Sequence, residues 1–125
     1  MNPEIKNIVK QAKKDPTILA IALFGSYARK EKYNDIDICL FLKHSNHSQK
    51  KLSQKKLEYT SENPKIDVSI FQQLPLYIKE RVIKEGKFLY GKDAPELYDL
   101  CFEMLRDLDD HKPFYEEYLT AVANG

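Results

Sequence analysis

The chain has 125 residues, with 20 basic and 19 acidic side chains and a formal net charge of +1. This balance gives no overall attraction to nucleic acid or to an anionic membrane, so direct nucleic-acid binding is not expected. No apolar run approaches the roughly 18 residues of a membrane span, and the first residues lack the apolar core of a signal peptide.

Chain length and cysteine content indicate the number of domains and the cellular compartment. We expect one domain over residues 1–125, with a core at about 1–91 and a helical segment at about 95–123. Cys39 and Cys101 have neither the spacing of a metal site nor the density of a secreted scaffold. A soluble, cytoplasmic protein is therefore expected.

The first predicted elements are a helix and a strand. Apolar residues recur at helical spacing over residues 3–14, and Asp15-Pro16 ends this helix. Residues 17–24 are apolar on both faces, which is typical of an inner strand. Residues 25–32 then predict a short helix.

Two later segments alternate between polar and apolar side chains and predict strands. In residues 35–42, Asp35 and Asp37 share one face, which we expect to bind cations, while the other face packs in the core. In residues 65–71, Asp67 lies opposite the apolar face, so it can stand beside the first two carboxylates if the strands pair. The surface helix predicted between them, at 49–61, has three apolar anchors: Leu52, Leu57 and Tyr59.

The last third of the chain reads as mostly helical. A helix is predicted at 76–85, a short strand or turn at 88–91, and a helix from Pro95, with a further helical segment from Pro113. The apolar stripe expected on the helix from Pro95, as core or as a contact with a partner, consists of Leu97, Cys101, Met104, Leu105 and Leu108. A partner surface is predicted on these C-terminal helices, at Met104, Leu108, Tyr115, Tyr118 and Val122.

The residues that carry chemistry gather around one turn. Gly25-Ser26 follows an apolar strand and opens a helix, an arrangement whose backbone N–H groups can bind phosphate, although the same groups could be used only for capping. Arg29, one helical turn on from Ser26, can reach a triphosphate or simply cover the surface. Because paired carboxylates repel each other, Asp35 and Asp37 indicate a divalent metal, and their hard oxygen ligands suit magnesium.

The order Gly25-Ser26, then Asp35-Ile36-Asp37, then Asp67 on a later strand resembles the minimal nucleotidyltransferases of the polymerase-β-like superfamily. The likeness extends to about Gly91 and implies an α/β (α+β) fold, with a small mixed sheet packed by helices and with C-terminal helices. The spacer between Ser26 and Asp35 has eight residues, fewer than is usual in that family, with Lys30 where a glycine is common.

This resemblance implies an enzyme. Asp35, Asp37 and Asp67 would hold two Mg²⁺ ions and act as the catalytic residues, while Gly25, Ser26 and Arg29 would bind the nucleotide, with ATP as the substrate. Members of this size resemble the antitoxins of HEPN-type ribonuclease toxins, whose activity is AMPylation of a toxin tyrosine within a hetero-oligomer. An antitoxin that neutralises by binding alone, or a nucleotidyltransferase acting on a small molecule, remains an alternative.

Overall fold

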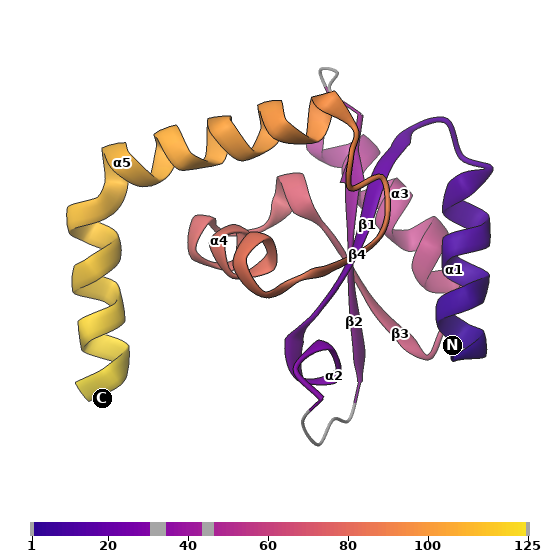
Figure 1. Ribbon diagram of the computed structural model, residues 1–125, viewed down its shortest axis with the longest axis horizontal. Coiled ribbons are helices and arrows are strands. Elements are labelled where there is room, and N and C mark those ends of the chain that lie inside the picture. Colours follow the sequence, from indigo (N-terminus) through magenta and orange to yellow (C-terminus); the bar gives the residue numbers. More distant parts are fainter. Residues whose placement is uncertain (1, 31–34, 44–46, 125) are drawn as a thin grey trace.

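A four-stranded sheet lies between two layers of helices in the computed structural model of the chain (Figure 1). The structure describes residues 2–30, 35–43 and 47–124, and the side chains of Ser26 and of residues 110–124 lie outside this description. The elements are α1 (Pro3–Lys13), β1 (Ile18–Phe24), α2 (Gly25–Ala28), β2 (Ile36–Leu42), α3 (Gln49–Glu62), β3 (Ile66–Ile70), the 3₁₀ turn η1 (Phe71–Gln73), α4 (Leu76–Glu85), β4 (Lys87–Tyr90) and α5 (Pro95–Asn124). The predicted fold class, an α/β fold with a small mixed sheet, is confirmed.

The sheet has the strand order β3-β2-β1-β4. Strand β1 runs antiparallel to both β2 and β4, whereas β2 and β3 are parallel. A parallel pair needs a crossover connection, and α3 supplies it. The register of this pair sets Asp37 directly beside Asp67, which brings together two carboxylates that are 30 positions apart in the chain.

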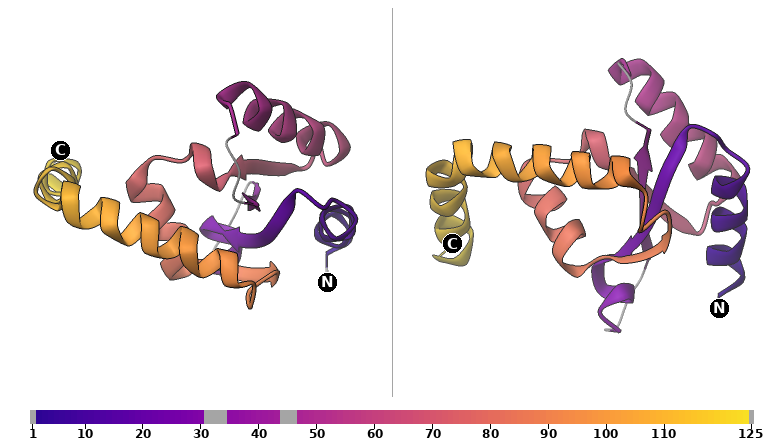
Figure 2. Two further views of the ribbon diagram at one scale, coloured as in Figure 1. Left: turned by 90° about the horizontal axis from the view of Figure 1, so that it is seen from above. Right: turned by 45° about the horizontal axis from the view of Figure 1, so that its top comes forward.

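Both long N-terminal helices begin at a side-chain cap. The Asn2 side-chain oxygen accepts a hydrogen bond from the Glu4 backbone N–H at 2.8 Å, and the Ser48 hydroxyl accepts one from the Lys51 backbone N–H at 3.2 Å. Each cap satisfies an N–H group that has no partner within its helix. These two helices, α1 and α3, cover one face of the sheet, and α4 and α5 cover the other (Figures 1 and 2).

Both faces of β2 are buried beyond Asp37, although only one face was predicted to pack in the core. Ile38, Leu40 and Leu42 pack against α1 and α3, as predicted for the apolar face. On the carboxylate face, however, Cys39 and Phe41 are fully buried beneath the α4–α5 layer. The expectation of one cation-binding face was therefore wrong for most of the strand, because a second core begins two residues beyond Asp37.

The structure shows whether three of the predicted apolar side chains are buried or exposed. Leu57 is 67% exposed on α3, and Leu105 is 49% exposed on α5, where Leu100 takes its place in the buried stripe. Met104 is only 4% exposed and belongs to the core, so its assignment to a partner surface was wrong. Leu108 also packs partly against that core.

Helix α5 continues through Pro113 as one element, although a separate segment was predicted to begin there. The ribbon turns sharply where its colour passes from orange to yellow (Figure 1), in the part of the helix that contains Pro113. Proline removes one helical hydrogen bond and crowds the preceding turn, which accounts for such a bend. The side chains of Tyr115, Tyr118 and Val122, predicted for the partner surface, lie outside the described part.

In the described ranges, no helix combines the length and the apolar character that crossing a lipid bilayer requires.

Candidate active site

The turn at Gly25 brings the end of β1 against the start of β2. Phe24 pairs with Asp37 across the two strands, and the next residue, Gly25, has a φ of 76°. A Cβ atom placed on Gly25 would lie 2.3 Å from Oδ2 of Asp37. Glycine is therefore required at this position for two reasons: the backbone conformation favours it, and the Asp37 carboxylate occupies the space that a Cβ atom would need.

Asp37 and Asp67 form the centre of the site. Burial raises the pKa of Asp37, and so do the charge of Asp67, a side-chain hydrogen bond with Asp67 and the charge of Asp35, so that it reaches about 6. The positive charge of Arg29 acts in the opposite direction. The three predicted carboxylates and Arg29 thus interact electrostatically in the folded chain, although they come from three different segments.

The three aspartates differ in exposure. Asp37 is half-buried, while Asp67 and Asp35 are exposed. Asp35 lies in a bend just before β2, which begins at Ile36 rather than at Asp35 as predicted. Its side chain is therefore not fixed by the sheet, in contrast to those of the two paired aspartates.

The predicted phosphate loop is shorter than expected. Helix α2 spans only Gly25–Ala28, not residues 25–32, and Lys32 lies outside the described residues. Ser26 lies within this single turn. The first N–H groups of a helix have no partner inside it, so the backbone at Gly25 and Ser26 can donate to phosphate oxygens. A helix of one turn adds little dipole, so this binding would depend on those N–H groups.

Arg29 makes an ion pair that the sequence did not reveal. Its Nη1 donates a hydrogen bond to Oε2 of Glu85 at 3.2 Å, and both side chains are about 40% exposed. Glu85 is the last residue of α4, 56 positions away. No local pattern marks Glu85, because only the packing of α2 beside α4 brings it near Arg29.

Lys30 occupies the position where a glycine is common in the family that the sequence resembles. Its φ of 60° lies in the left-handed region, which glycine adopts at little cost and lysine adopts under strain. The backbone at Lys30 therefore has a conformation that favours glycine, although the residue carries a side chain.

The donor set at the site suits magnesium. Within the described residues, no three His, Cys, Asp or Glu side chains converge as they would around a bound metal ion. The available ligands are the carboxylates of Asp37 and Asp67, with that of Asp35 close enough to raise the pKa of Asp37. Hard oxygen ligands of this kind fit Mg²⁺, and a divalent cation would relieve the repulsion that raises this pKa.

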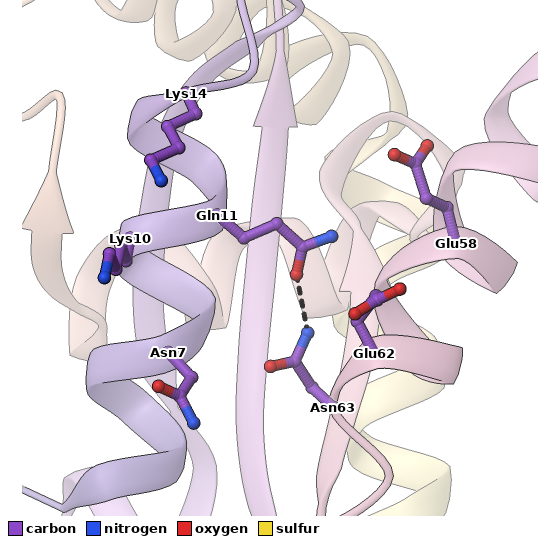
Figure 3. A pocket seen from close by; sticks show the side chains of 7 residues that line it. All are labelled: Asn7, Lys10, Gln11, Lys14, Glu58, Glu62 and Asn63. Carbon is purple, nitrogen blue, oxygen red and sulfur yellow. Dashed lines mark hydrogen bonds between the residues drawn. The ribbon is translucent and has the colours of Figure 1, made fainter.

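A hollow of about 380 Å³ lies between α1 and α3, on the other side of the sheet from Asp37 (Figure 3). Its lining carries two lysines and two glutamates, so it does not favour an anion. Asn63, which is buried there, donates hydrogen bonds to Oε1 of Gln11 at 2.9 Å and to the carbonyl of Tyr59 at 2.8 Å. The first of these bonds joins α1 to the C-terminal end of α3, so the residues around the hollow hold the two helices together.

Comparison with known proteins gives a family match over most of the chain. Residues 6–95 match the family described as polymerase beta, nucleotidyltransferase. A protein of Methanocaldococcus jannaschii that is named a putative protein adenylyltransferase is 38% identical over 78 residues, which cover 61% of this chain. The matched part is 58% of that relative's length.

Solved structures share the fold. A crystal structure of a toxin–antitoxin with AMP-PNP has a TM-score of 0.62 at 16% identity, covering 93% of this chain and 96% of the other. The Shewanella oneidensis structure of a tri-AMPylated HEPN toxin in complex with MNT antitoxin has a TM-score of 0.56 at 17% identity, covering 97% and 92%. At these identities the likeness is one of fold.

Proposed function

Because this chain belongs to the polymerase beta nucleotidyltransferase family, we propose that it transfers AMP from ATP to a tyrosine hydroxyl of a HEPN-type toxin. It would thereby act as the antitoxin in a hetero-oligomer with that toxin. The observation that carries the proposal is the Asp37–Asp67 pair, held beside a positive-φ glycine at the end of an inner strand. The name of the Methanocaldococcus relative and the complexes formed by proteins of the same fold support this choice of acceptor.

Each residue of the site has a proposed role in binding or orienting the reactants. The N–H groups of Gly25 and Ser26 would donate to phosphate oxygens, and Arg29 would offset their charge. Asp35, Asp37 and Asp67 would hold two Mg²⁺ ions, which supply charge neutralisation on the phosphates and a lower pKa for the acceptor hydroxyl. Asp67 is the exposed member of the pair and is therefore the one that an acceptor can approach.

The proposed reaction is a substitution at the α-phosphorus of ATP. The tyrosine oxygen forms a bond to this phosphorus, the bond to the bridging oxygen of the β-phosphate breaks, and pyrophosphate leaves. The tyrosine proton passes to solvent. The two cysteines, which are not joined in a disulfide, would suit a reducing cytoplasm.

ATP labelled at either the α- or the γ-phosphate distinguishes AMP transfer from the alternative activities. We expect transfer to the HEPN-type protein from ATP labelled at the α-phosphate, none from ATP labelled at the γ-phosphate, and none in EDTA. Transfer of the γ-label would indicate a kinase instead. A stable complex with no transfer from any of the four nucleotides would favour an antitoxin that acts by binding alone, and labelling of a small molecule only would favour the other enzyme alternative.

A further inference from the structure

The outward face of α5 carries a stripe of large apolar side chains. Tyr98, Phe102 and Leu105 are 55%, 68% and 49% exposed. Their spacing of four and three residues sets them one above another on one side of the helix. The opposite side of α5 is buried against the sheet layer through Leu97, Leu100 and Met104. Helix α5 crosses α4 and continues past the sheet (Figures 1 and 2).

Acidic side chains border this stripe. Asp99 and Glu103, together with Phe102 and Arg106, line a hollow of about 390 Å³ along it. From Pro95 to Asp109 the helix has five acidic residues and one basic residue, a net charge of −4 in a chain whose total is +1. Among the described residues, neither Asp99 nor Glu103 forms an ion pair with a basic side chain. The apolar stripe is thus bordered by two acidic side chains and one basic side chain, which is a local excess of negative charge.

We infer that this face of α5 binds a helix of a partner protein whose apolar side is bordered by lysine or arginine. A row of three large side chains beside a shallow hollow suits the ridges of a second helix. The acidic border favours a basic partner and disfavours a second copy of this chain, because self-pairing would bring two helices of net charge −4 together. Exposed aromatic and leucine side chains would anchor the contact.

This inference rests on the proposed function, under which the partner is the HEPN-type toxin. To that function it adds the surface of this chain that binds the toxin, and the apolar and basic character of the toxin helix that binds there. That surface differs from the one predicted from the sequence, because Met104 faces the core while Phe102 and Leu105 face outward.

The test is a calorimetric titration of the full chain with the proposed partner, a purified HEPN-type protein from the same organism. The double variant Phe102→Ala, Leu105→Ala should bind at least about tenfold more weakly, since exposed anchors at the centre of an interface carry much of its affinity. The matched control is Leu57→Ala, which removes a leucine that is 67% exposed on α3, and it should bind like wild type. Circular dichroism should show unchanged folding for both.

A second pair of variants tests the charge. Glu103→Lys should weaken binding and reduce its dependence on salt, whereas Glu62→Lys, an equal charge change on α3, should leave both unchanged. Wild-type affinity in both α5 variants would overturn the inference, and so would failure of the wild-type chain to bind. A dimer of the chain alone that Phe102→Ala dissociates would assign the face to a second copy instead. Binding without AMP transfer would contradict the proposed function and leave this docking surface standing.

Discussion

At the scale of single residues, the folded state disfavours the charged form of Asp37, and this lowers the free energy of unfolding at neutral pH. Its pKa is raised to about 6 from an ordinary value of 3.8, so the folded chain binds its proton more tightly than the unfolded chain does. The free energy of unfolding therefore falls as pH rises from about 4 through about 6, and the loss is complete above that range. In EDTA at pH 7.5, Asp37→Asn should unfold at a higher temperature than wild type, because its free energy of unfolding should be higher by up to about 1 kcal/mol after allowance for solvent screening.

Magnesium should reverse this order. Binding of Mg²⁺ to the folded state raises the unfolding temperature of wild type, and Asp37→Asn should respond less because it lacks one ligand charge. Differential scanning calorimetry with and without Mg²⁺ measures both effects. Equal magnesium shifts in the two proteins would place the metal elsewhere.

Asp15 shows the opposite sign and provides a contrast. Burial raises its pKa, but hydrogen bonds from Thr17, Lys55 and Tyr59 outweigh this effect and lower it to about 2. Asp15 thus stabilises the fold above its ordinary pKa of 3.8, and this stability is lost as pH falls through about 2. At pH 7.5, Asp15→Asn should lower the free energy of unfolding by about 1–2 kcal/mol, measured by urea denaturation. An unchanged or raised value would contradict this account.

Gly25 can be tested against Gly91, a second glycine with positive φ. Gly25→Ala would press a methyl group on Asp37 Oδ2, whereas in Gly91→Ala the clash is with the backbone oxygen of Leu19, away from the aspartates. Both should lose about 1–3 kcal/mol of stability through backbone strain. Only Gly25→Ala should also weaken ATP binding in magnesium, measured by calorimetry on the folded protein. Wild-type ATP affinity in Gly25→Ala would place the nucleotide elsewhere.

The sequence predicted the carboxylates of the candidate site better than their surroundings. Asp37 and Asp67 each occupy a polar position in an alternating segment, so their shared face followed from the period of a strand, and the register confirms that they are neighbours. The ion pair of Arg29 with Glu85 could not be predicted, because it depends on how α2 packs beside α4.

At the scale of elements, two substitutions on α5 can show which face of this helix packs in the core. Met104 is 4% exposed and Phe102 is 68% exposed, only two residues away. Met104→Ala should lower the free energy of unfolding by about 2–5 kcal/mol, whereas Phe102→Ala should change it by less than about 0.5 kcal/mol. Chemical denaturation of the two variants measures the difference. A larger loss for Phe102→Ala would mean that the outward stripe packs within the chain.

Strands were easier to predict than helix ends and helix faces. Strict alternation predicted β2 and β3 to within one residue at each end. The faces of α5 were harder, because leucine and aromatic residues occupy most of its circumference, and the sequence alone does not show which leucines the sheet covers. The end of α2 and the passage of α5 through Pro113 depend on tertiary packing, which overrides local propensity.

At the scale of the whole molecule, the proposed catalytic site and the proposed docking surface lie on different elements. The aspartates occupy the start of β2 and of β3, while the stripe at Tyr98, Phe102 and Leu105 occupies the outer side of α5. A variant of one region should therefore leave the other intact: Asp37→Asn should still bind the toxin, and the α5 variants should still bind ATP in magnesium.

The central claim is that the aspartate cluster catalyses AMP transfer to the toxin. The most direct measurement is the intact mass of the HEPN-type protein after incubation with ATP, Mg²⁺ and either wild type or Asp37→Asn, with complex formation checked in parallel. We predict that wild type adds AMP, located on a tyrosine by peptide mapping, and that Asp37→Asn forms the complex but adds none. An unmodified toxin in the wild-type complex, or equal modification by Asp37→Asn, would contradict the claim.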